Sequence, residues 1–179
     1  MDRLDAATAL ARSWAYSLPP LDEFDPELTE MLAPYGPRFP GLAPGQDQAL
    51  TEAELARALG RFGPARIGLV PAARPADVLA LIGYGGTVNR YGTPGQLSAA
   101  MRSWENRFGA VLVEVGFDHI CLLARRPPRT LPDAQAVAAE LWSFCDEFWP
   151  IDHPGTAVRE IGAIAESILD VPIWSLWLD

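Results

Sequence analysis

The sequence predicts an α+β fold, an antiparallel sheet of about four strands with helices packed on one face, preceded by an N-terminal helical segment. Three observations predict it. The length of 179 residues suits one well-packed domain and is marginal for two. Six Trp, seven Phe and four Tyr exclude a disordered chain. From residue 65 the expected elements follow the order β, α, α, β, β, α, α, β, which reduces to the βαββαβ order of a ferredoxin-like unit.

The first 64 residues form the predicted N-terminal extension. Residues 2–16 place Leu, Ala and Trp at helical spacing. Residues 26–33 predict a short second helix, since an aspartate precedes a proline at its start. Residues 34–48 contain four Pro and three Gly, which is typical of a loop. Thr51 and Glu54 form a capping box that begins a third helix, ending near a glycine at 60 or 63.

The predicted α+β domain covers residues 65–179. Residues 67–70 are short, apolar and bounded by proline, so they predict its first strand. Residues 75–82 predict one helix, with Pro and Asp in its first turn. Residues 83–89 form a glycine-rich loop that lacks the Lys-Ser/Thr of a phosphate-binding loop.

The middle of this domain predicts a helix and a hairpin. Residues 96–108 are amphipathic and stop at Gly109, a residue that suits the end of a helix. Residues 110–115 are rich in β-branched residues and alternate in the pattern of a strand. A Gly-Phe-Asp turn follows, and residues 119–124 predict a second strand, so that the two form a β-hairpin.

The last third predicts two helices and a strand. Residues 131–148 form a long apolar run with Pro and Asp near its start, which indicates a helix. Thr156 is the expected cap of a second helix that runs to about residue 169. Residues 172–178, rich in Trp, predict the final strand.

The net charge of the chain limits the classes of molecule that it is expected to bind. All 14 basic residues are Arg, and 23 acidic residues bring the formal charge to −9. A pI near 4.7 argues against binding to nucleic acid or to an anionic membrane. With no basic leader and no apolar run of about 18 residues, the expected location is the cytoplasm. Residues 133–179 hold nine acids and one Arg, which indicates either a solvated helical face or a docking surface for a basic protein.

Few residues suggest catalysis, a metal or a cofactor. Cys121 and Cys145 lie in apolar runs and are expected to be buried thiols rather than a disulfide framework. His119 and Cys121 would share one strand face, a geometry that rarely yields a nucleophile and its base. His153 is expected in a turn. With two His and no Cys-x-x-Cys pair, the sequence predicts no zinc site, and we expect no catalytic residue and no cofactor.

The strongest candidate for ligand chemistry is the predicted helix that ends at Gly109. Arg102 and Glu105 are three residues apart and can pair, while Arg102 or Arg107 could reach an anion or the carboxylate of a partner. If the glycine-rich loop meets this helix, Asn89 would join these three residues in a small-molecule site. The alternative is a helix packed by aromatic residues and covered with ion pairs.

Several motifs, in this order, resemble the bacterial domain-of-unknown-function 4253 family over about residues 67–179. They are Gly83-Tyr84-x-Gly86-x-x-Asn89, the stretch 102–110, Gly116-Phe117-Asp118, Arg126-Pro127-Pro128, Ala138-Ala139-Glu140 with Phe144-Cys145, and Trp174–Asp179. The chain departs from the family where Leu141 replaces a His after the Glu and Leu178 replaces a Trp. The resemblance implies the fold and boundaries, and an association with immunity proteins encoded beside secreted toxins.

Three functions remain open at this point. The leading one is an immunity protein that binds and neutralises a basic toxin domain. Its expected contacts are Asp146, Glu147, Asp152, Glu160 and Glu166. The second is a small-molecule binder or enzyme at the Asn89–Arg107 site. The third is a module of a larger assembly that docks through an aromatic patch of Trp142, Trp149, Trp174 and Trp177, for which burial in the core is the alternative.

Overall fold

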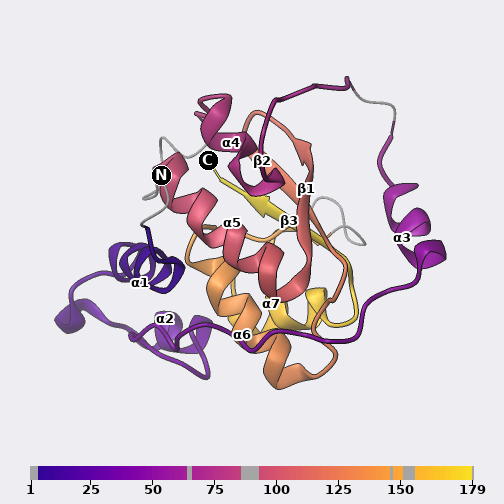
Figure 1. Cartoon of the computed structure of the whole chain (residues 1–179). Helices are drawn as coiled ribbons and strands as arrows, with labels where there is room; N and C mark the ends of the chain where they lie inside the picture. Colours follow the sequence, from indigo (N-terminus) through magenta and orange to yellow (C-terminus); the bar gives the residue numbers. More distant parts are fainter. Residues whose placement is uncertain (1–3, 64–65, 86–92, 146, 151–155, 179) are drawn as a thin grey trace.

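A three-stranded antiparallel sheet lies at the centre of the computed structural model (Figure 1). The strands are β1 (Ala110–Val115), β2 (His119–Ala124) and β3 (Ile173–Trp177), in the order β1-β2-β3. The α+β class and the hairpin are therefore confirmed. The structure describes residues 4–63, 66–85, 93–145, 147–150 and 156–178.

The predicted first strand is absent from the described sheet. Residues 67–70 are extended but make no ladder with any strand, and the side chains of Ile67 and Leu69 are 92% and 94% exposed. The four-stranded sheet and the βαββαβ order are accordingly not found in the part of the chain that the structure describes. The apolar, proline-bounded pattern reports an extended backbone, but strand pairing also needs a neighbouring edge within hydrogen-bond reach.

Three helices cover the inner face of the sheet: α5 (Pro94–Phe108), α6 (Leu131–Trp142) and α7 (Ile161–Ile168). Helix α5 starts at a Thr93 capping box and ends at Gly109, whose positive φ of 61° suits glycine. The main core lies between these helices and the inward side chains of the strands. Its largest fully buried members include Trp14, Trp104, Trp174, Phe108 and Phe148.

Two helix boundaries differ from the sequence expectation. Helix α6 ends at Trp142 rather than near residue 148, because Phe148 makes isolated β-bridges with Val158 and Leu176 and so takes an extended backbone. Helix α7 begins at Ile161, with Glu160 rather than Thr156 at its cap. The expected helix over residues 75–82 is a 3-10 turn (Pro75–Asp77) followed by α4 (Val78–Leu81).

The N-terminal extension packs against this domain on two sides. Helix α1 (Ala6–Tyr16) lies on α5, and the ring of Trp14 is 4.9 Å from that of Trp142. After a 3-10 turn (Leu21–Glu23) and α2 (Pro26–Met31), the chain crosses the molecule to α3 (Glu52–Leu59), which uses the predicted capping box (Figure 1). Helix α3 covers part of the outer sheet face, where Leu55 and Ala58 pack on Leu123 and Ile173. None of the described helices has the length and hydropathy that a membrane span needs.

Candidate functional site

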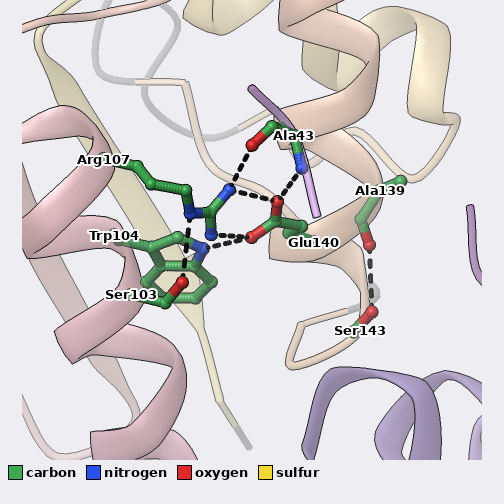
Figure 2. A network of polar contacts seen from close by, with 7 residues as sticks. All are labelled: Ala43, Ser103, Trp104, Arg107, Ala139, Glu140 and Ser143. Carbon is green, nitrogen blue, oxygen red and sulfur yellow. Dashed lines mark hydrogen bonds and ion pairs between the residues drawn. The ribbon is translucent and has the colours of Figure 1, made fainter. Parts of the chain in front are cut away.

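The most buried charge described in the molecule is the carboxylate of Glu140, on α6 (Figure 2). It is fully buried and accepts four hydrogen bonds. Arg107 donates from Nη1 at 2.7 Å and from Nη2 at 2.6 Å, Trp104 donates from Nε1 at 2.9 Å, and the backbone N–H of Ala43 donates at 2.5 Å. A buried carboxylate needs such partners, because burial without a cation and donors is strongly unfavourable.

Helix periodicity brings these groups together. Trp104 and Arg107 are three residues apart on α5, so both side chains reach the facing α6. The guanidinium of Arg107 is held by Ser103 Oγ, 3.0 Å from its Nε, and lies 4.9 Å from the centre of the Phe108 ring. These contacts within α5 hold the guanidinium in its orientation.

The fourth donor comes from the extension. Residues 39–46, which we call the strap, contain no helix or strand and pass Arg107 near the C-terminal end of α5. Arg107 Nη1 donates to the Ala43 carbonyl at 2.7 Å, so one residue of the strap both gives and accepts a hydrogen bond (Figure 2). Gln46 N–H donates to the Arg107 carbonyl at 3.1 Å, and Ala43 itself is buried. The Arg107–Glu140 pair therefore fastens the extension to the domain.

The structure separates the residues predicted for a small-molecule site. Arg102 pairs with Asp77 at 2.7 Å, and Glu105 pairs with Arg74 at 2.9 Å. The third residue, Arg107, is turned towards Glu140, and Asn89 lies outside the described residues. The structure thus does not bring the three described residues to one ligand, and it gives each arginine a carboxylate partner within the protein.

The predicted acidic contacts also differ from one another. Glu160 and Glu166 are exposed, and Glu147 forms an ion pair with Arg159. Asp146 and Asp152 lie outside the described residues.

The predicted aromatic patch divides between core and surface. Trp142 and Trp174 are buried, whereas Trp149 and Trp177 are half-buried with ring centres 5.4 Å apart.

The end of the outer sheet face near the β1–β2 hairpin carries a half-buried His119 and a buried Cys121. Asp118 Oδ1 is 2.9 Å from His119 Nδ1, and the imidazole stacks on Trp177 with ring centres 6.3 Å apart. Burial raises the pKa of the Cys121 thiol to about 11, with a smaller contribution from Glu114. A protonated buried thiol is a poor nucleophile. Cys145 is likewise a buried thiol, and His153 lies outside the described residues. No cluster of three His, Cys, Asp or Glu side chains suited to a metal occurs among the residues described.

An open groove of about 900 Å³ runs beside the outer edge of β1. One wall is β1 itself, and the other is the extended segment of residues 66–72, which we call the arm. The groove is mostly apolar, with Arg66 and Glu114 as its charged members. It is lined by Arg66, Gly68, Leu69, Val70, Ala72, Pro75, Val78, Ile82, Leu112, Val113, Glu114 and Val115. Phe117, at the tip of the β1–β2 hairpin, is 89% exposed.

Sequence reasoning missed both the Glu140 network and the groove. The sequence signal available for the network was Glu140, an acidic residue within an apolar run, together with Arg107 on another amphipathic helix. The sequence signal for the groove was weaker: it consisted of the apolar residues of the arm, which also fit the pattern of a strand.

Comparison with known protein families places the greater part of the chain in one of them. The sequence model of the family described as "Domain of unknown function (DUF4253)" matches residues 66–179. No curated protein and no solved structure matches the chain. The match includes β1 to β3, Trp104, Arg107 and Glu140, and it begins at the first residue of the arm. Because it spans more than half of the chain, this protein belongs to the DUF4253 family.

Proposed function

We propose that this chain is a non-enzymatic protein-binding domain and that the groove beside β1 receives its partner. The observation that carries the proposal is the apolar groove of about 900 Å³ with Ile67 and Leu69 held almost fully in water. Burying one such side chain contributes about 1.5–3 kcal/mol. A contiguous apolar surface of this kind is typical of a protein interaction site.

The chemistry of the described side chains also supports binding over catalysis. Arg102 and Arg107, the cations expected to reach a ligand, are engaged by Asp77 and Glu140. The Cys121 thiol is buried, and its raised pKa keeps it protonated near neutral pH. These contacts stabilise the fold, whereas the groove is a surface feature that no contact within the described residues fills.

For the partner, we propose a basic protein, most concretely a toxin domain that this chain neutralises as an immunity protein. The net charge of −9 would attract a basic partner and speed its association. Glu160 and Glu166 are exposed acids that can add to this attraction. Glu147, which pairs with Arg159, stays in the proposal as a further contact, and so do Asp146 and Asp152, which lie outside the described residues.

The test of the groove is a capture experiment with three versions of the tagged full chain. The wild type, Leu69→Asp and Leu21→Asp proteins are each incubated with lysate of the source organism, and bound proteins are identified by mass spectrometry. Leu21 is the matched control, because it is 74% exposed and lies in the extension. We expect one stoichiometric partner with the wild type and the control, and its loss with Leu69→Asp. Retention by Leu69→Asp, or no protein partner at all, would overturn the proposal.

The test of the charge uses the same captured partner. Replacing Glu160 and Glu166 by lysine changes the net charge by four, from −9 to −5. We expect association with a basic partner to slow by about tenfold at low salt, with a shallower dependence on ionic strength. An unchanged association rate would remove the acidic surface from the proposal and leave the groove.

A further inference from the structure

The hydrogen bonds of the Glu140 carboxylate divide into two groups. A carboxylate offers about four acceptor positions, and three of these are filled by Arg107 and Trp104. The two donor residues and Glu140 itself lie within the family match, residues 66–179. The fourth position, on Oε1, is filled by Ala43, which lies outside the match. The family domain alone therefore offers one acceptor that only another segment or molecule can fill.

Arg107 Nη1, the donor next to this acceptor, also has a bond that only the strap supplies. Arg107 Nη1 bonds Glu140 Oε1 and also bonds the Ala43 carbonyl at 2.7 Å. Without the strap, an open donor and an open acceptor would therefore lie side by side, as Figure 2 shows for Arg107 and Glu140. A single extended residue presents its N–H and C=O on one side, as paired residues of antiparallel strands do.

We infer that Arg107 and Glu140 form a receptor for one residue of extended peptide backbone, and that the strap is its internal ligand. The inference is independent of the groove beside β1, because the two sites share no residue. It assigns a second binding site to the domain. The ligand is an extended peptide, recognised through its main chain.

The strap also indicates which peptides the receptor accepts. Ala43 is buried, so the residue bound between Arg107 and Glu140 has to be small. The proline at position 44 favours an extended backbone for Ala43, which suits this pairing. Gln46 N–H then bonds the Arg107 carbonyl three residues further on. The expected ligand is therefore a small residue followed by proline, within an extended segment.

The experiment frees the receptor in the full chain and offers the ligand as a separate peptide. In Ala43→Glu, a carboxylate replaces a buried methyl group beside Glu140, and the strap should detach. The probe is a fluorescently labelled, end-blocked peptide with the sequence of residues 39–46, titrated while anisotropy is recorded. A tethered segment competes at an effective concentration of about millimolar. We therefore expect Ala43→Glu to bind the peptide at least tenfold more tightly than the wild type.

Two controls keep the result decisive. Leu42→Glu introduces the same charge at the adjacent exposed position and should bind the peptide as weakly as the wild type. A second peptide, N-methylated at the alanine that corresponds to Ala43, lacks the donated hydrogen and should bind at least tenfold more weakly. If Ala43→Glu does not fold, as judged by circular dichroism, Ala43→Pro removes the same N–H with less bulk and replaces it. Equal binding by the folded variant and the wild type, or equal binding of the two peptides, would overturn the inference.

Discussion

The strap and the arm are two extended segments of one chain with opposite surroundings. The strap, residues 39–46, buries Ala43 and exchanges backbone hydrogen bonds with Arg107 and Glu140. The arm, residues 66–72, keeps Ile67 and Leu69 more than 90% exposed and stands across a groove from β1. Both are rich in proline, glycine and apolar residues. Their difference shows that such a segment is fixed by the partner it meets rather than by its own composition.

The same contrast appears on the outer sheet face. Where α3 lies on it, Leu55 and Leu123 are buried together. At the end near the hairpin, His119, Trp177 and Phe117 are half-buried or exposed. The extension thus covers one end of the outer sheet face and leaves the end near the hairpin without such a cover. Four measurements test this difference and the one between the strap and the arm.

The largest expected effect is the loss of the cation that holds the strap. Arg107→Met leaves Glu140 buried without its ion-pair partner, so the free energy of unfolding should fall by about 3–5 kcal/mol. Equilibrium denaturation in guanidinium chloride measures it. The matched control is Arg125→Met, which removes an exposed ion pair with Glu52 and should change stability by about 0–1 kcal/mol. Similar losses in both variants would contradict the special role of the buried pair.

A smaller effect is expected when one leucine is shortened on each side. Leu55→Ala should destabilise the protein by about 2–4 kcal/mol, because it leaves a cavity between α3 and the sheet. Leu69→Ala in the arm should change stability by no more than about 0.5 kcal/mol. Thermal and chemical denaturation both report the difference. A large loss for Leu69→Ala would mean that the arm is packed in solution.

Hydrogen exchange tests the comparison without any substitution. The amides of Ala43 and Gln46 are hydrogen-bonded within the protein and should exchange at least about a hundredfold more slowly than in an unfolded chain. The amides of Ile67 and Leu69, in the exposed arm, should exchange close to the unfolded rate. Equal protection of the two segments would remove the distinction between them.

The smallest change concerns one thiol on the outer sheet face. Desolvation raises the pKa of Cys121 from about 9 to about 11, so at pH 8 its thiolate is about a hundredfold scarcer than that of an unfolded chain. Labelling with a disulfide reagent should therefore be slow in the native protein and should accelerate as the pH rises towards 11. Rapid labelling at pH 8 would show that this end of the sheet opens to solvent.

Local patterns predicted the elements that depend on local chemistry. The capping box at Thr51, the stop at Gly109 and both strands of the hairpin were placed correctly, because each follows from neighbouring residues. The strand expected over residues 67–70 is absent from the described sheet, and the helix expected over residues 131–148 ends at Trp142. Both differences arise because strand pairing and the end of that helix depend on contacts with segments far away in the sequence. Periodicity cannot supply such contacts.

The candidate sites were predictable in part. The sequence drew attention to Arg107 but expected it to reach a ligand, whereas it bonds Glu140 and a backbone residue 64 positions earlier. The motif that carries Glu140 supported the family resemblance, and the match over residues 66–179 confirms that family. The role of Ala43 had no signal, because an alanine in a proline-rich loop carries no distinctive side chain.

The backbone contact at Ala43 has a consequence for how such domains diverge. Glu140 and Arg107 reach only main-chain atoms of the strap, so any small residue at this position would serve equally well. Substitutions by other small residues at this position would leave the contact intact. The sequence of the strap would therefore diverge faster than Arg107 and Glu140, the two residues that bind it. Relatives could therefore retain an equivalent segment whose sequence no longer aligns with the strap. A search for that segment should compare structures and its position beside these two residues rather than sequence identity.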